Sequence, residues 1–98
     1  MTPFRTLAEA RDAHKTAGGH FFDRASMRFF DSRIESALYG GRYFITSEQF
    51  HDGSYHAVRG YTIREVKADT SIDTVDRFQA YATLAEARSV ARTMSKEP

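Results

Sequence analysis

The sequence contains no cysteine and no tryptophan, and it has two prolines among 98 residues. Without cysteine the chain has no disulfide, no thiolate ligand for zinc and no cysteine nucleophile, which fits a reducing compartment. No apolar run is long enough to cross a membrane, and the N-terminus lacks an apolar segment behind basic residues. We therefore expect a cytoplasmic protein with no membrane partner.

An excess of charge of one sign is also missing. Fourteen Lys and Arg balance thirteen Asp and Glu, so the net charge is +1. No basic block argues for bulk affinity for nucleic acid, and no acidic surplus argues for mimicry of DNA. Most of the basic residues are arginine, which binds carboxylates and phosphates in a bidentate manner and suits recognition surfaces. GC-rich coding explains the same bias equally well.

The hexapeptide TLAEAR occurs twice, at Thr6–Arg11 and at Thr83–Arg88. In each copy a glutamate follows the threonine three positions later, which is the pattern of a capping box at a helix N-terminus. Apolar residues continue at helical spacing beyond each copy. We predict two capped helices, the first ending at Gly18-Gly19 and the second near Ser95. The threonine, the leucine, the glutamate and the second alanine each have a local helical reason, which favours convergence over gene duplication. The shared arginine has none.

The chain between these helices has the composition of β-strands. Gly40 and Gly41 separate two runs rich in β-forming residues, which predicts a two-residue hairpin turn with Leu38 opposite Tyr43. A third strand is predicted over residues 57–67.

Gly60 is a candidate bulge in the third strand. A loop is predicted over residues 69–73, followed by a fourth strand over residues 74–82 that leads into the second capped helix. Residues 20–33 fit either a short helix capped by Asp23 or an edge strand, and we favour the helix.

The predicted fold class is α+β, with elements in the order α-(α)-β-β-β-β-α. An antiparallel sheet of about four strands carries the N- and C-terminal helices packed on one of its faces. Residues 1–98 are expected to form a single domain, because a chain of this length is too short for a second core.

Signatures of catalysis are missing as well. The sequence has no nucleophile elbow and no phosphate-binding glycine loop. His51 and His56 lie on either side of Asp52, but their spacing matches no established zinc pattern, so surface histidines in a polar loop explain them better. We expect no enzymatic activity, no cofactor and no metal. His14 is expected at the boundary of the core on the first helix.

Two basic patterns are candidates for binding surfaces. Each terminal helix carries two cations four residues apart, Arg11 with Lys15 and Arg88 with Arg92, which suit phosphate or an acidic protein surface. Ordinary solvated helix faces explain them better.

The predicted strands carry arginines interleaved with tyrosines, as on the sheet faces of some RNA-binding domains. Strand aromatics more often belong to a core. The residues of this sheet-face pattern are Arg59, Tyr61, Arg64, Arg77 and Tyr81.

The motifs MRFFDSRI at residues 27–34 and YGGRYFITSEQF at residues 39–50 resemble a family of small proteins encoded by phages, prophages and plasmids. The resemblance continues through YTIREV and IDTVDRFQAYAT and covers most of residues 20–94. It implies an accessory protein of a mobile element acting inside a bacterial cell. Such proteins often occupy a surface of a host machine, as anti-CRISPR and other anti-defence inhibitors do.

The resulting hypothesis is a non-enzymatic binding protein, monomeric or homodimeric, that inhibits or modulates a host protein or ribonucleoprotein complex of defence or nucleic-acid processing. The alternative is a small nucleic-acid-binding protein that uses arginine and tyrosine. Arginine and aromatic residues dominate interface hot spots. On that ground the predicted partner-binding residues are Arg28, Arg33, Tyr39, Arg42, Tyr43, Arg88 and Arg92.

Overall fold

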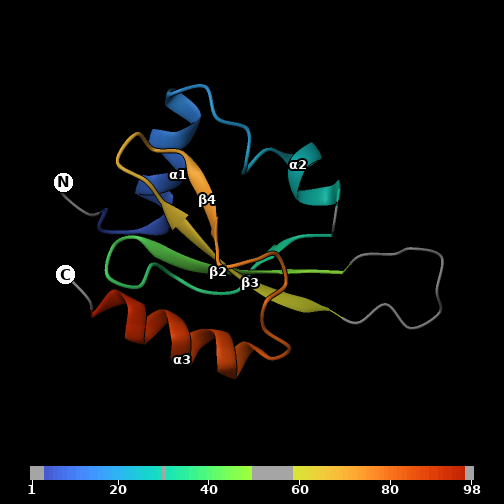
Figure 1. The fold of residues 1–98 in the computed structure, drawn as a ribbon. Helices are drawn as coiled ribbons and strands as arrows, with labels where there is room; N and C mark the ends of the chain where they lie inside the picture. Colours follow the sequence, from blue (N-terminus) through green and yellow to red (C-terminus); the bar gives the residue numbers. More distant parts are fainter. Residues whose placement is uncertain (1–3, 30, 50–58, 97–98) are drawn as a thin grey trace.

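The structure is a computed structural model that describes residues 4–29, 31–49 and 59–96. Over these residues the chain forms, in order, α1 (Leu7–Thr16), α2 (Arg24–Phe29), β1 (Arg33–Ile34), β2 (Tyr43–Glu48), β3 (Gly60–Val66), β4 (Ile72–Val75) and α3 (Leu84–Ser95) (Figure 1). The strands make one antiparallel sheet in the order β1-β2-β3-β4. The predicted α+β class and the predicted order of elements are confirmed.

Both terminal helices begin at the predicted threonines. The backbone N–H of Glu9 donates to Thr6 Oγ1 at 3.1 Å, and that of Glu86 donates to Thr83 Oγ1 at 3.2 Å. α1 ends just before Gly18, whose φ of 93° closes the helix as only glycine does without strain. The repeated hexapeptide therefore marks two helix starts.

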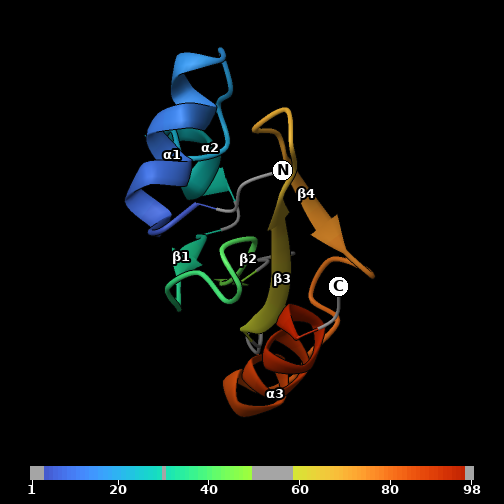
Figure 2. The ribbon, with the colours of Figure 1, turned by 90° about the vertical axis from the view of Figure 1, so that its left-hand side faces the viewer.

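The two terminal helices lie on opposite faces of the sheet, so the prediction that they share one face is wrong. Side chains alternate along β2: Tyr43 and Ile45 pack toward Ala87 of α3, whereas Phe44 packs toward Ala10 of α1. Figures 1 and 2 show α1 and α2 on one side of β2 and β3 and α3 on the other. Every residue of β2 is buried, which requires cover on both faces.

The face of the sheet toward α1 has an aromatic core. The rings of Phe22 and Phe44 stack with their centroids 5.8 Å apart, and Phe21 meets Phe44 edge-on at 6.0 Å. The opposite cluster, under α3, is built from Tyr43, Ile45, Ile63, Tyr81, Ala87 and Ala91.

The hairpin turn has a different register from the predicted one. Gly40 and Gly41 have φ of 60° and 72°, as the predicted turn requires. The bridge across the turn pairs Tyr39 with Tyr43, however, so the loop holds one residue more than expected. Leu38, predicted opposite Tyr43, packs instead against the cluster on the α1 face.

β3 confirms the third predicted strand, although residues 57 and 58 of that prediction lie outside the described residues. Gly60 is not a bulge, because it pairs with Glu48 in regular register. A Cβ on Gly60 would lie 2.9 Å from Cβ of Gln79, so this glycine permits a close approach of the connection to α3.

β4 begins and ends earlier than predicted. It covers Ile72–Val75 and stops at Asp76, which has a φ of 65°. Beyond this break Tyr81 returns to the sheet as an isolated bridge to Tyr61. The segment predicted as the fourth strand is thus mostly a bent connection to α3.

The short helix favoured within residues 20–33 is confirmed as α2, while Arg33 at the end of that stretch begins the edge strand β1. The first turn of α2 is closed by the backbone N–H of Met27, which donates to the carbonyl of Asp23 at 3.0 Å.

Removing the two capping hydroxyls should give additive losses of stability. We expect Thr6→Ala and Thr83→Ala each to lower the free energy of unfolding by about 1 kcal/mol. The sheet separates the two caps, so the double variant should lose the sum to within about 0.5 kcal/mol. Urea denaturation checks this, with the exposed Thr16→Ala as the control. A clearly non-additive double variant would contradict independent helix starts.

Candidate functional site

A fully buried carboxylate, that of Glu48, lies at the end of β2. It accepts hydrogen bonds from Thr46 Oγ1 at 2.5 Å, Thr62 Oγ1 at 2.8 Å and Arg64 Nη2 at 2.8 Å. These side chains lie on the same face of the sheet as Phe44, because residues two apart on a strand share a face. A buried charge is tolerated when it is paired and hydrogen-bonded in this way.

Arg64 of β3 links this carboxylate to the surrounding segments. Its side chain is 12% exposed. Nε donates to Thr46 Oγ1 at 3.1 Å, and Nη1 donates to Thr74 Oγ1 of β4 at 2.6 Å. The guanidinium carbon lies 5.2 Å from the ring centroid of Phe21 and 5.7 Å from that of Phe78. Arg64 therefore holds two aromatic side chains on its own face of the sheet, one from the chain before α2 and one from the connection between β4 and α3.

A pocket of about 220 Å³ opens beside this arginine. Phe78 comes from the connection between β4 and α3, while Ser26 and Met27 come from α2. The six lining residues are Phe21, Ser26, Met27, Ser32, Arg64 and Phe78. The lining thus combines two rings and a thioether with two hydroxyls and a guanidinium.

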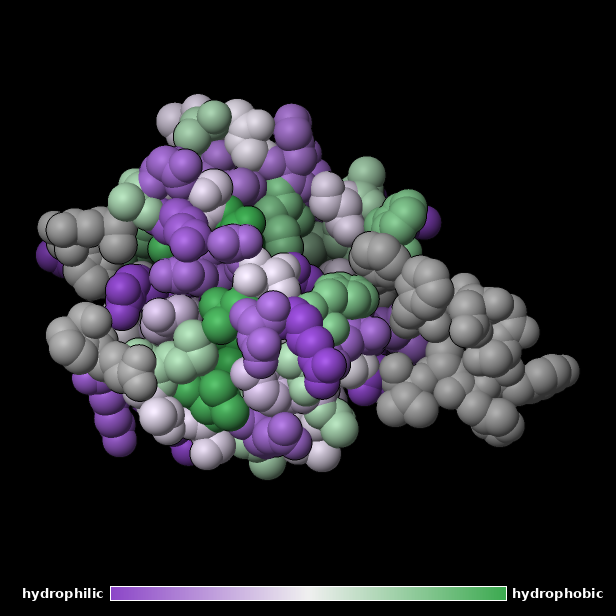
Figure 3. Space-filling model, viewed as in Figure 1, coloured by the Kyte–Doolittle hydropathy of each residue, from purple (hydrophilic) through white to green (hydrophobic). Residues whose placement is uncertain are grey.

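The surface around the pocket exposes large hydrophobic side chains. Phe29, Ile34 and Phe78 are 76%, 41% and 40% exposed. Arg28 and Arg33 are exposed in the same stretch of chain. In Figure 3 hydrophobic residues are exposed at the α2 end of the molecule, next to hydrophilic ones. We call Arg28, Phe29, Arg33, Ile34 and Phe78, with the pocket beside them, the α2 surface.

The predicted partner-binding residues separate into two groups. Arg28 and Arg33 belong to the α2 surface. The other five lie on the α3 side of the sheet or on α3 itself, where Arg88 and Arg92 are exposed. That second group is Tyr39, Arg42, Tyr43, Arg88 and Arg92.

Tyr43, which belongs to the second group, is largely buried. It is 8% exposed and belongs to the core under α3. The guanidinium carbon of Arg42 lies 5.2 Å from its ring centroid, so this arginine covers the tyrosine. Tyr39 is half-buried against the same core.

The predicted sheet-face pattern of arginine and tyrosine does not form one surface. Tyr61 and Tyr81 pack with the core under α3, whereas Arg64 lies on the opposite face. Arg59 Nη2 is bound to Asp31 Oδ2 at 2.6 Å, and its side chain is 16% exposed.

Sequence reasoning missed Glu48 as the partner of Arg64. A signal was present, because polar residues recur at alternate positions of two strands, at Thr46 and Glu48 and at Thr62 and Arg64. Polar residues that share one strand face with the apolar Phe44 indicate a buried network instead of a solvated face.

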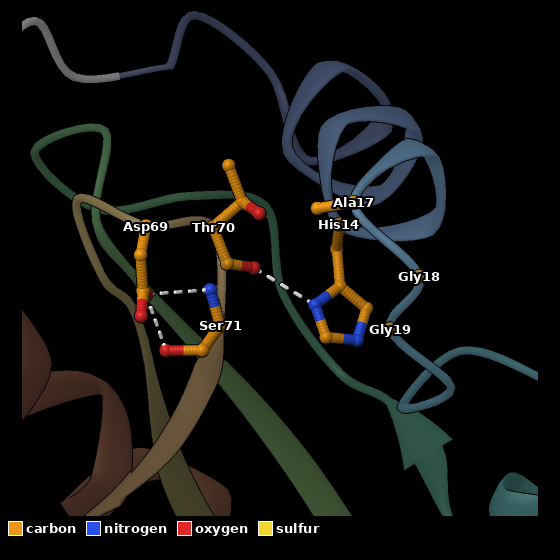
Figure 4. Close-up of a pocket in the computed structure, with 7 residues that line it drawn as sticks. All are labelled: His14, Ala17, Gly18, Gly19, Asp69, Thr70 and Ser71. Carbon is orange, nitrogen blue, oxygen red and sulfur yellow. Dashed lines mark hydrogen bonds between the residues drawn. The ribbon is translucent and has the colours of Figure 1, made fainter.

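A second pocket, of about 270 Å³, lies where the end of α1 meets the turn between β3 and β4 (Figure 4). His14 Nε2 accepts from the backbone N–H of Phe21 at 3.1 Å, so Nδ1 carries the proton and donates to the carbonyl of Thr70 at 2.8 Å. His14 is 7% exposed, so it is buried and not at the boundary of the core. A Cβ on Gly19 would overlap its ring. His14 thus ties α1 to the strand turn.

Metal ligation by His51, Asp52 and His56 falls outside the described residues. Across residues 4–29, 31–49 and 59–96, no three His, Asp or Glu side chains are grouped to hold a metal ion. In that same part of the chain, no helix has the length and apolar character needed to cross a membrane.

The family of unknown function DUF7447 matches residues 6–92, from the first capping threonine to the last turn of α3. The chain belongs to this family. No curated protein and no solved structure matches it significantly. For this DUF7447 protein, an origin in a mobile element stays a prediction from the resemblance.

The buried ion pair of this DUF7447 protein should behave as a coupled unit. Glu48→Met leaves Arg64 without its carboxylate and should cost about 3–5 kcal/mol of the free energy of unfolding. The double variant Glu48→Met with Arg64→Met removes both charges and should be less destabilised than Glu48→Met alone. Chemical denaturation of both singles and the double measures the coupling. A double variant that loses the sum of the two singles would contradict a coupled pair.

Asp69, in the turn between β3 and β4 beside His14, should have a carboxyl pKa below its ordinary value. Ser71 donates to Asp69 Oδ1 from Oγ at 2.6 Å and from its backbone N at 3.0 Å, and these bonds hold the pKa of Asp69 below its ordinary value. These bonds stabilise the folded protein fully above the pKa of Asp69 in the unfolded chain, about 3.9. The stabilisation is lost as the pH falls through the lower pKa of Asp69 in the folded protein.

Ser71→Ala should therefore raise the pKa of Asp69 toward its ordinary value. Carbon-detected NMR titration of the carboxyl group measures it, with the exposed Ser89→Ala of α3 as the control. An unchanged pKa in Ser71→Ala would show that the hydroxyl of Ser71 is not the cause, because the backbone N–H remains in the variant.

Proposed function

We propose that this protein is a non-enzymatic binding protein of a mobile genetic element, which inhibits or modulates a bacterial defence or nucleic-acid-processing complex through protein contacts. The sequence resemblance to proteins of phages, prophages and plasmids supports the cellular context. The α2 surface supports the mode of action.

The observation that carries the proposal is the exposure of Phe29, Ile34 and Phe78 among arginines. Single exposed hydrophobic residues are common on any protein. Here Ser26 and Met27 of α2 line one pocket together with Phe78, and Phe29 ends the same helix. Exposed aromatics, arginine and an adjoining pocket are the composition of interface hot spots.

The buried network beneath this surface supports a binding role because it holds the pocket in shape. Arg64 is bound to Glu48, Thr46 and Thr74, and Phe21 and Phe78 lie against its guanidinium. A surface that is ordered before binding loses less conformational entropy in the complex.

A second candidate function is binding of nucleic acid by α3. Arg88 and Arg92 are exposed and four residues apart on that helix, which suits contacts to phosphates. This function requires retention on DNA or RNA that weakens steeply with salt.

Two double variants with the same change in charge distinguish the α2 surface from the α3 surface as the binding site. Tagged wild-type protein, Arg28→Glu/Arg33→Glu and Arg88→Glu/Arg92→Glu are expressed in a bacterium with active CRISPR or other immunity. We expect the wild type to co-purify with a component of a defence or nucleic-acid-processing complex and to lower immunity in a plaque assay. The α2-surface variant should lose both effects, by about tenfold or more, and the α3 variant should keep them.

Recovery of the wild-type protein alone, with immunity unchanged, would refute the proposed function. Loss of both effects in the α3 variant, together with retention on nucleic acid at low salt, would favour the second candidate.

A further inference from the structure

We infer that the pocket beside Arg64 is an anchor site that receives one apolar side chain from an acidic segment of the partner protein. This inference rests on the proposed protein-binding function and adds the chemistry of the bound segment. It follows from the lining of the pocket and from the charges around it.

The lining of the pocket favours an apolar group. Phe21, Met27 and Phe78 present two rings and a thioether to a space of about 220 Å³. Burial of an apolar side chain against such groups is favourable in proportion to the area removed from water. The pocket therefore suits a phenylalanine or leucine side chain of the partner.

The charge inside the pocket is already balanced, which disfavours an anion as the inserted group. Arg64 Nη2 lies 2.8 Å from Glu48 Oε2, so a carboxylate or phosphate entering the pocket would meet a pair with no net charge. Each terminal nitrogen of Arg64 carries a second N–H beyond the bonds to Thr74 and Glu48. These donors, with the hydroxyls of Ser26 and Ser32, suit a neutral acceptor such as a backbone carbonyl.

The charges on α2, which lines one side of the pocket, are positive, and this favours an acidic segment on that side. α2 contains Arg24 and Arg28 and no acidic residue. Asp23, just before the helix, is bound to His20 at 2.8 Å.

β1 adds Arg33 to this basic rim. The carboxylate nearest to it, Asp31, is bound more closely to Arg59, at 2.6 Å against 4.0 Å. Arginines exposed beside an apolar pocket match a segment in which acidic residues flank one apolar side chain.

The probes are short synthetic peptides. The first has a central phenylalanine with glutamates on both sides. The second has alanine in place of the phenylalanine, and the third has lysines in place of the glutamates. Each is titrated into the isotope-labelled full chain, and binding is followed by NMR shifts of backbone amides and of the Arg64 Nε–H.

We expect the first peptide to shift the backbone amide resonances of Phe21, Ser26, Ser32 and Phe78. The affinity of the other two peptides should be lower by about tenfold or more. Equal binding of the alanine peptide would overturn the apolar anchor. Equal binding of the lysine peptide would overturn the acidic segment. Shifts of the same residues by oligothymidine, with displacement of the first peptide, would assign the pocket to nucleic acid and overturn the inference.

A matched pair of variants tests the pocket itself. Ser26 lines the pocket and Ala25 does not, and both are exposed on α2. Ser26→Leu should fill the pocket and weaken the first peptide about tenfold, whereas Ala25→Leu should bind it as the wild type does. Equal affinity of the two variants would overturn the anchor site.

The same two variants distinguish failure of the inference from failure of the proposed function. A cellular partner that is lost on Arg28→Glu/Arg33→Glu but retained by Ser26→Leu would leave the protein-binding function standing and refute only the anchor pocket.

Discussion

The salt bridge between Glu48 and Arg64 is the interaction on which the α1-facing half of the molecule depends. A carboxylate with no exposed surface requires a charged partner and further donors, and these come from β2 and β3. Once Arg64 is held there, its guanidinium lies against Phe21 and Phe78. The position of α2 and the shape of its pocket follow from a charge pair in the sheet.

His14 connects this arrangement to the first helix. Its Nε2 accepts from the backbone N–H of Phe21, the residue whose ring lies against Arg64. Its Nδ1 donates to the turn after β3. Contacts to Phe21 therefore connect the two pockets. His14 positions the backbone of Phe21, and Arg64 positions the ring of Phe21. Among the described contacts, the role that the geometry gives this histidine is structural.

Burial of β2 on both faces decides where binding surfaces can lie. Tyr43 and Ile45 are covered by α3, and Phe44 is covered from the α1 side. The arginines predicted to bind a partner are consequently divided between two sides of the sheet. Because Arg28 and Arg88 lie on different sides of the sheet, each can be changed without disturbing the surface around the other. Experiments can therefore test the two candidate binding surfaces of the DUF7447 protein one at a time.

The sequence by itself determined the features that depend on neighbouring residues. Thr6 and Thr83 start helices because each accepts a hydrogen bond from three residues away, and Gly40 turns the chain because glycine accepts positive φ. Tertiary structure alone decided which face of the sheet each helix covers, because an apolar stripe specifies burial but not a partner. It also decided that Glu48 is buried, because its donors on β3 are separated from it by a long stretch of chain.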